Sequence, residues 1–331
     1  EIEDTWGVST NPVHDFFKPK RKITHQEMVQ EILDLAKEKD VTFPEHLSEE
    51  IVKAIPASSK KDEILFEENS LTIHKDTPVF DGQLSNRCYT DAVKNAFINF
   101  KENAIKRGRY NEDTDDIITE QWSRIVVHLP YAFQGKRMFP DVFMLDRKET
   151  HTGASIIKQI GEDPSADETQ MAGFNDSEQE KIKNGYRRLI SKTEEYQKFT
   201  ADKIEKTQKA SGFVGNQYTA SIFLALMSTL EIDLNDDNKL EGKKIGFCAY
   251  GSGAKSKVFQ GIVQKDWAEI TKRFNLFSRL ENRTAINATT YEALHRGYQI
   301  ESVVKPSGEF VIESVGGSDV LEGHRKYTWV D

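Results

Sequence analysis

Hydrophobic positions follow helical spacing in some segments and form short strand-like runs in others, and their order indicates the fold class. From Cys88 to Phe100 apolar residues recur every four positions, which predicts an amphipathic helix ending near Gly108. The β-branched run at 125–127 is typical of a strand buried on both faces. Helices that alternate with short apolar strands indicate an α/β protein.

The most apolar stretch of the chain, 212–230, predicts a glycine turn followed by a buried helix. After it, 244–250 predicts a strand and 258–263 its antiparallel partner across the turn at 251–253. Because so short a connection excludes a parallel crossover, the sheet should be mixed. Nearer the C-terminus the pattern predicts a short helix capped at 289–292 and a hairpin of strands 298–304 and 309–315.

Two segments are much more polar than the rest. From Ile23 to about Lys61 the pattern is helical, with a capping box at 24–27, and it indicates either a solvated helical pair or a surface insertion that acts as a lid. The second polar segment, 145–210, predicts a loop near 161–177 and then a helix.

Composition excludes several classes of protein. With 45 Lys and Arg against 54 Asp and Glu, the chain carries a net charge of −9 and offers no basic platform for nucleic acid. No apolar run reaches the ~20 residues that cross a membrane. Two cysteines exclude a disulfide scaffold or a four-cysteine metal site, and the eight histidines lack metal-ligand spacing. The chain starts with neither Met nor a signal sequence, so we expect a cytoplasmic piece of a longer protein.

Three positions are candidates for chemistry. His128 follows the buried run 125–127, at the end of a core strand that would face a ligand crevice. Its imidazole could bind a carbonyl oxygen or exchange a proton, or it could merely satisfy a backbone carbonyl. Asn216 precedes the apolar helix and could cap it or donate its amide to an oxyanion. The turn at 250–253 could let backbone approach a ligand closely, or be an ordinary hairpin turn.

Taken together and in order, these positions resemble the hydroxymethylglutaryl-CoA synthase family, a branch of the thiolase-like condensing enzymes. The matching motifs are DFFKP at 15–19, PVFDGQLS at 78–85, HLPY at 128–131, GNQYTAS at 215–221 and GFCAYGSG at 246–253. Each motif is weak alone, but the ordered set is specific.

The resemblance implies a layered α/β/α/β/α thiolase-like fold with a mixed sheet, of which this chain supplies mainly the second half. Residues 1–22 would end the N-terminal half, and 23–77 would be a polar helical insertion. Residues 78–331 would form the C-terminal half, with a further polar insertion at about 145–210.

The family condenses acetyl-CoA with acetoacetyl-CoA in the mevalonate pathway of isoprenoid biosynthesis, so the resemblance implies an acyltransferase. CoA thioesters are its substrates, and no other cofactor and no metal is expected. In the family a cysteine carries the acetyl group, a glutamate removes its proton, and a histidine with a nearby asparagine polarises the acetoacetyl thioester. By motif these last two are His128 and Asn216. The residues expected to bind substrate or CoA are Lys136, Arg137, Tyr218, Gly251 and Ser252.

The family's nucleophile and base precede the motif that resembles DFFKP, and neither Cys88 nor Cys248 matches the nucleophile. We therefore expect this chain alone to be inactive, with the missing half elsewhere in a longer chain or on a partner subunit, and a homodimer in the full-length form. Two alternatives stay open. The chain could be a non-catalytic CoA-binding scaffold subunit, or part of a polyketide β-branching synthase that acts on carrier-protein thioesters.

Overall fold

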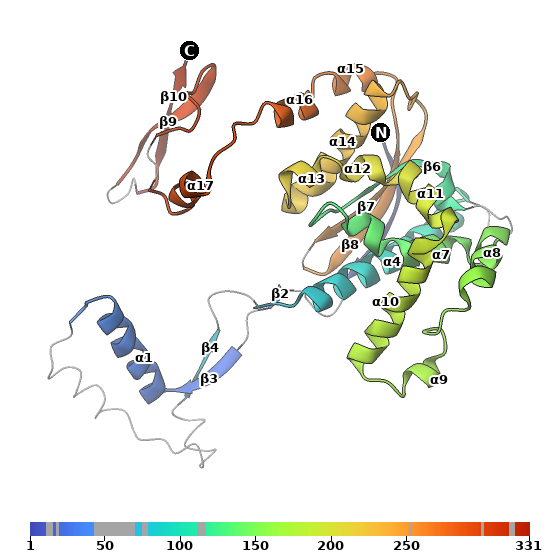
Figure 1. Ribbon diagram of the computed structural model, residues 1–331, viewed down its shortest axis with the longest axis horizontal. Helices are drawn as coiled ribbons and strands as arrows, with labels where there is room; N and C mark the ends of the chain where they lie inside the picture. The colour runs from blue at the N-terminus through green and yellow to red at the C-terminus, as the bar shows by residue number, and fades with distance from the viewer. Residues whose placement is uncertain are drawn as a thin grey trace. The chain divides into compact units, whose positions relative to one another are not determined.

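The structure is a computed structural model. It describes residues 1–10, 16–17, 20–42, 70–74, 79–110, 117–251, 253–298, 301–317 and 322–331. These residues divide into two compact units, Glu1–Phe274 and Asn275–Asp331 (Figure 1). Several predicted features lie outside the described residues: most of the DFFKP motif, the later part of the polar helical segment, and Ser252.

A four-stranded mixed sheet forms the centre of the first unit. Its strands are β1 (Ile2–Thr10), β6 (Trp122–Val127), β7 (Lys244–Gly251) and β8 (Lys255–Ile262), in the order β1-β8-β7-β6. β6 runs parallel to β7, and the other pairs are antiparallel, which confirms the mixed sheet and the predicted hairpin. The N-terminal strand thus belongs to the same sheet as the later strands. The three-part domain division stays a prediction.

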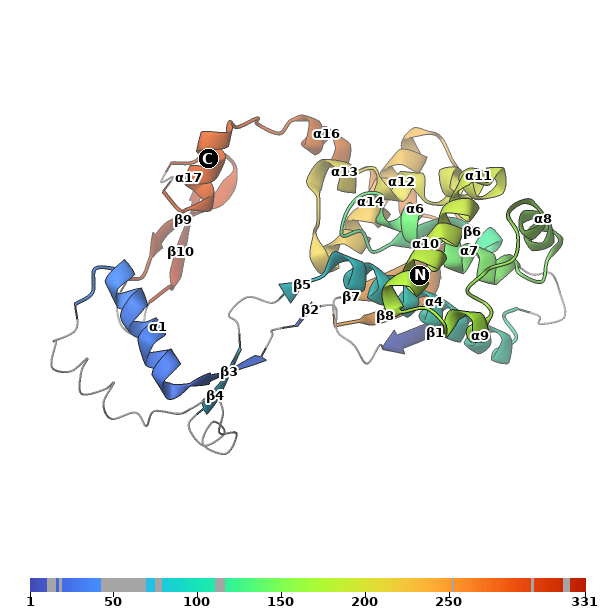
Figure 2. The same cartoon turned by 60° about the horizontal axis from the view of Figure 1, so that its bottom comes forward.

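Helices α4 (Gly82–Lys106) and α14 (Ser221–Asn235) cover opposite faces of this sheet (Figures 1 and 2). Side chains alternate between the two faces along β7. A Cβ on Gly246 would overlap the Trp122 ring, which packs against α4, whereas Phe247 lines a cavity together with side chains of α14. The predicted helix at 88–108 is therefore confirmed as the cover of one face.

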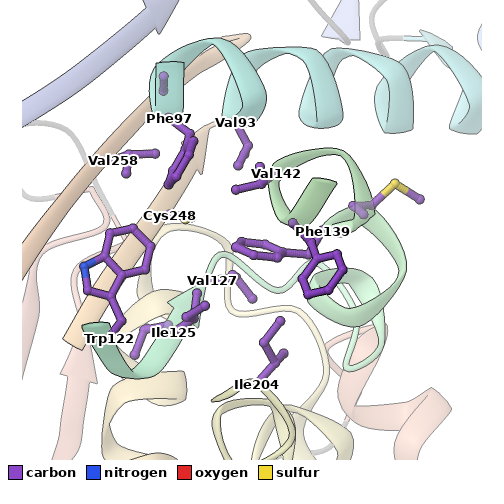
Figure 3. Packing of buried hydrophobic residues seen from close by; sticks show 14 of the residues in the cluster. Val93, Phe97, Trp122, Ile125, Val127, Phe139, Val142, Ile204, Cys248 and Val258 are labelled. Atoms are coloured by element: carbon purple, nitrogen blue, oxygen red, sulfur yellow. The ribbon is translucent and has the colours of Figure 1, made fainter. Parts of the chain in front are cut away.

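The core lies between the sheet, α4 and the helical segment after β6, which contributes Phe139, Val142 and Ile204 to the same cluster (Figure 3). Phe97 of α4 meets the indole of Trp122 edge-on, with ring centroids 6.0 Å apart. The buried indole N–H donates to Gln260 Oε1 at 2.6 Å, so its polar atom is satisfied. The run 125–127 is buried, as predicted for a strand covered on both faces.

α4 also covers the edge strand β1. Val8 N–H donates to Asn99 Oδ1, and the Asn103 amide donates to the carbonyl of Trp6, both at 3.0 Å. Gly7 has no room for a Cβ, which would lie 2.0 Å from the carbonyl oxygen of Ala96. These side-chain contacts satisfy backbone groups that an open sheet edge would leave unpaired.

The polar segment 145–210 is more helical than predicted. The loop near 161–177 is interrupted by the short helix α9, where Asp167 caps the first turn and Met171 is buried. A capping box of Asn175 and Glu178 then starts the long helix α10. The helices from 118 to 214 are α5 (Ile118–Gln121), α6 (Gln134–Met138), α7 (Pro140–Arg147), α8 (His151–Ile160), α9 (Glu168–Met171), α10 (Asp176–Lys192), α11 (Glu194–Lys203), α12 (Glu205–Gln208) and α13 (Ser211–Val214).

The first polar segment begins as predicted. Thr24 Oγ1 accepts a hydrogen bond from Glu27 N–H at 3.1 Å, and the Glu27 carboxylate accepts one from Thr24 N–H at 2.9 Å, which confirms the capping box. The helix that it starts is α1 (His25–Glu38). Two strand pairs flank the segment: β3 (Lys20–Thr24) with β4 (Ser70–His74), and β2 (Phe16–Phe17) with β5 (Val79–Phe80).

The second unit corrects two predictions. β9 (Glu309–Val315) pairs with β10 (Arg325–Val330), so the hairpin of 298–304 with 309–315 is wrong. Aromatic pairing explains the choice, because Phe310 and Trp329 lie opposite each other and their rings meet at 5.1 Å. Helix α17 (Ala288–His295) is capped by Asn287, before the predicted cap, since the Asn287 side chain accepts from Thr290 N–H. The remaining helices are α15 (Trp267–Thr271), in the first unit, and α16 (Leu276–Glu281).

Candidate functional site

His128 directly follows β6 and its backbone is bound on both sides. Its N–H donates to the carbonyl of Cys248 at 3.0 Å, and its carbonyl accepts from the buried Tyr89 hydroxyl at 2.9 Å. The side chain is only 7% exposed. The structure thus places His128 at the end of a core strand, as the sequence predicts, with little freedom to move.

The imidazole is oriented by Ser221, the first residue of α14. Ser221 Oγ lies 2.7 Å from His128 Nδ1, and it also accepts a hydrogen bond from Leu129 N–H at 3.2 Å. Among the described residues, the Ser221 hydroxyl has His128 Nδ1 as its acceptor, so Ser221 Oγ–H donates to Nδ1. The hydrogen-bond network therefore assigns the hydrogen of the neutral ring to Nε2. Nε2–H becomes the donor available to a ligand, since among the described residues no backbone carbonyl is bonded to the ring.

Two contacts join α14 to β6 and so hold this pair in place. At the far end of α14, the buried carboxylate of Asp233 forms a bidentate pair with Arg124 of β6, at 2.7 and 2.8 Å. At the near end, Ser221 contacts His128. Hydrogen bonds at both ends of α14 thus restrain the position of Ser221 and of the imidazole that it contacts.

Burial lowers the pKa of the His128 imidazole to about 4 from an ordinary value near 6.5. The ring is therefore neutral at physiological pH. Burial also raises the pKa of the Tyr89 phenol, which keeps that hydroxyl protonated as a donor to the His128 carbonyl. The site at neutral pH consists of uncharged donors in an apolar surrounding.

His128 lines a cavity of about 560 Å³ between α14, the sheet and α15. Its wall is largely apolar, with Ile222, Phe223 and Leu226 from α14 and Phe247 and Phe259 from the strands. A mostly apolar cavity with a few polar groups is typical of small-molecule sites. Here a neutral N–H donor beside apolar walls can bind and polarise a carbonyl oxygen.

Helix α14 is only partly buried, which corrects the prediction of a buried helix. Ala225 and Ser228 are buried, but Phe223 is 63% exposed. The Ser228 hydroxyl donates to the Lys206 carbonyl of α12, whereas Phe223 lines the cavity that α14 shares with the sheet and α15.

Asn216 occupies a different position from the one predicted. Its Oδ1 accepts from Tyr218 N–H at 2.7 Å, forming a turn before the short 3₁₀ helix η1 (Tyr218–Ala220). The N-cap of α14 is Ala220, so Asn216 does not cap that helix. It is exposed and does not line the His128 cavity, whereas Thr219 of the same motif does. The motif reaches His128 through Ser221, which the sequence reasoning did not single out.

The other predicted binding residues are dispersed. Lys136 is paired with Glu205 at 2.5 Å, and Arg137 lines a second, polar cavity. Tyr218 is 73% exposed. Gly251, exposed at the end of β7, does not line the His128 cavity. The structure thus brings His128 and the 219–221 segment together, and places the predicted cationic residues elsewhere.

Neither cysteine is suited to carry an acyl group. Cys248 is fully buried on β7, and burial raises the pKa of its thiol to about 12. Cys88 is buried in α4.

The side chains described here form no group of three or more His, Cys, Asp or Glu that could hold a metal ion. Among the helices of the described ranges, none has the length and apolar character needed to cross a bilayer.

Solved structures with the same fold include HMG-CoA synthases, which are thiolase-like. A structure of MvaS in complex with 3-hydroxy-3-methylglutaryl coenzyme A aligns with a TM-score of 0.60 and 19% identity, over 98% of this chain and 57% of that one. An HMG-CoA synthase complexed with CoA aligns with a TM-score of 0.50 and 18% identity, over 99% and 56% of the two chains. The fold is therefore thiolase-like.

The family itself is shown by sequence. The family model described as hydroxymethylglutaryl-coenzyme A synthase C terminal matches residues 70–305, and the chain belongs to this family. The hydroxymethylglutaryl-CoA synthase of Haloferax volcanii is 25% identical over 260 residues, covering 77% of this chain and 54% of that protein. The Schizosaccharomyces pombe synthase is 26% identical over 231 residues, covering 65% and 44%. The chain spans about half the length of these relatives.

The depressed pKa of His128 predicts a specific pH dependence of stability. Between about pH 6.5 and pH 4 the unfolded chain binds a proton at this site that the folded chain does not, so the free energy of unfolding falls as pH falls. The contribution should reach about 3 kcal/mol by pH 4 and change no further below it. Denaturant unfolding across this range should show a shallower decline in His128→Gln, whereas replacement of the exposed His151 by Gln should leave the decline intact. Equal slopes in all three proteins would contradict the buried neutral ring.

Proposed function

We propose that this chain forms the acyl-polarising half of a hydroxymethylglutaryl-CoA synthase, which condenses acetyl-CoA with acetoacetyl-CoA. Membership of the family supports the reaction class. The observation that carries the proposal is the neutral imidazole of His128, bound through Nδ1 to Ser221 beside an apolar cavity. That arrangement suits a carbonyl that gains negative charge during the reaction.

In the proposed reaction, a glutamate outside the described residues removes a proton from the methyl group of an acetyl thioester. The resulting carbanion equivalent forms a carbon–carbon bond to the ketone carbon of the acetoacetyl group, and that carbonyl oxygen becomes an alkoxide that is then protonated. Water then hydrolyses the thioester to the cysteine, which releases hydroxymethylglutaryl-CoA with a free carboxylate and regenerates the thiol. His128 Nε2–H binds this oxygen and stabilises its charge. The apolar walls around His128 exclude water from the carbanion.

The exposed part of α14 that lines the His128 cavity is where the rest of the enzyme would dock. Phe223 is 63% exposed, and neighbouring residues of α14 form the mouth of the His128 cavity. A cavity open along an apolar helix is closed when a second layer packs on that helix. We propose that the segment carrying the cysteine and the glutamate covers this face, either from the same longer chain or from a partner subunit. The complete enzyme would be a homodimer.

Asn216 retains a secondary role in the proposal. Its Oδ1 is bound in the turn with Tyr218, and its amide N–H₂ has no partner among the described residues. With the second layer in place, this amide is the donor we assign to the acyl thioester, next to the segment 219–221. We also propose that the substrates are CoA thioesters, that no resident cofactor is used, and that the enzyme works in the cytoplasm.

The test is an assay for hydroxymethylglutaryl-CoA formed from acetyl-CoA and acetoacetyl-CoA. The native assembly that contains this chain should form product, and the purified chain alone should form none, because both of its cysteines are buried. Acyl groups offered on a carrier protein serve as a second arm and distinguish a polyketide-type synthase. A native assembly that is inactive on both kinds of thioester would favour the scaffold alternative and reject the proposal.

A further inference from the structure

A second cavity lies away from His128, between the N-terminal turns of α4, helix α6 and helix α10. It has a volume of about 450 Å³. Its wall is polar, in contrast to the His128 cavity, and includes amide and hydroxyl groups of Asn86, Asn184 and Ser177. The volume falls in the range of small-molecule sites.

Positive charge dominates this cavity. Arg137, Lys181, Arg187 and Arg188 line it, with Glu180 as the carboxylate among the lining residues. Arg187 and Glu180 pair with each other, and Arg187 also binds Asp141 through two nitrogens.

Three cations of this cavity remain without a partner. Arg137, Lys181 and Arg188 form no hydrogen bond or ion pair with any residue in the described part of the chain. Three uncompensated cations directed at one cavity repel each other, and an anion that binds between them removes that repulsion. The cavity therefore favours a ligand with more than one negative charge.

A neutral donor adds to this cationic set. The Asn86 Oδ1 accepts from Gln134 Nε2 at 3.3 Å, which leaves the Asn86 N–H₂ without a partner among the described residues. Arginine forks, an ammonium group and an amide donor together match the oxygens of a phosphate group.

We infer that this cavity binds a phosphate-bearing ligand, with Lys181 and Arg188 of α10 as recognition residues in addition to Arg137. Two sources share this chemistry: the phosphates of a CoA thioester, and a free diphosphate or phosphorylated metabolite. The assignment of CoA as the source rests on the proposed function, whereas the phosphate site itself does not.

The test is a calorimetric titration of the full chain with inorganic pyrophosphate at low salt. Lys181→Gln combined with Arg188→Gln should weaken binding at least about tenfold, and added salt should weaken binding to the wild type. The matched control combines Lys192→Gln with Lys198→Gln, which remove two exposed charges outside the cavity and should change affinity less than about twofold. The substituted side chains are exposed and have no partner among the residues that the structure describes, so each variant should keep the wild-type circular dichroism spectrum.

CoA and dephospho-CoA in competition with pyrophosphate identify the source. If CoA displaces pyrophosphate from the wild type, and the variant with Lys181→Gln and Arg188→Gln no longer shows this competition, the site belongs to CoA. If pyrophosphate binds and CoA does not displace it, the site belongs to another phosphorylated ligand. Equal affinity of the double variant and the wild type, or no binding of either probe by the wild type, would overturn the inference. The condensation assay on the native assembly is run in parallel. If that assembly condenses the two CoA thioesters but the phosphate probes do not bind, the phosphate site is wrong while the proposed function stands.

Discussion

Replacing His128 with alanine in the complete enzyme is expected to lower the rate of condensation by at least about a hundredfold, the usual effect of removing one donor to a developing oxyanion. Loading of the acetyl group should continue, because acylation of the cysteine precedes the step in which His128 acts. Steady-state formation of hydroxymethylglutaryl-CoA measures the first effect, and mass spectrometry of the acetylated protein measures the second.

Two further variants sharpen this prediction. Ser221→Ala keeps the imidazole but removes its Nδ1 partner, so it should reduce the rate less than His128→Ala does and should allow the other tautomer. His151→Ala removes an exposed histidine of α8 and should leave turnover unchanged. Normal turnover in His128→Ala would reject the role given to this residue.

Phe223→Glu is the second substitution with a large expected effect. Because Phe223 is 63% exposed in this chain, the change should alter the free energy of unfolding by no more than about 0.5 kcal/mol. In the complete enzyme the same position would be buried under the proposed second layer. A carboxylate there would lose its hydration without a partner, at a cost of several kcal/mol, enough for at least about a hundredfold weaker association.

The measurement is sedimentation or co-purification of this chain with the segment that carries the nucleophile, supported by the condensation assay. Phe174→Glu is the matched control, since Phe174 is also exposed but precedes α10, outside the His128 cavity. The control should associate normally. If Phe223→Glu associates and turns over like the wild type, the second layer does not dock on this face of α14.

The spacing of apolar residues along the sequence correctly predicted those helices and strands in which buried positions recur at a regular interval. The helix at 88–108 and the hairpin of β7 and β8 were correct because each repeats its apolar positions at one period over several turns or residues. The C-terminal hairpin failed because its true partner strand is chosen by cross-strand aromatic contacts, such as Phe310 with Trp329, which sequence spacing does not encode.

The candidate site was predicted in part. The end of a buried strand is a local feature, so the position of His128 could be read from the residues before it. Its partner Ser221 lies 93 residues later, and only the folded chain brings the two together. Ser221 belongs to a motif that the sequence did single out, so the signal was present but attached to Asn216.

The burial of α14 could not be predicted from this chain alone. Its apolar residues predicted a buried helix, yet the structure buries α14 only in part, and Phe223, which lines the His128 cavity, is largely exposed. An apolar pattern in a sequence indicates that the residues tend to be buried. It does not indicate which other part of the protein packs against them. The same pattern therefore becomes evidence for the docking face that we propose.

One measurement tests the central claim most directly: a single turnover of acetoacetyl-CoA by enzyme already carrying its acetyl group. Rapid mixing of the acetylated wild-type assembly should release product, whereas the acetylated His128→Ala assembly should retain its acetyl group and form product at least about a hundredfold more slowly. Product release at the same rate from both would show that the imidazole beside Ser221 does not polarise the acyl carbonyl.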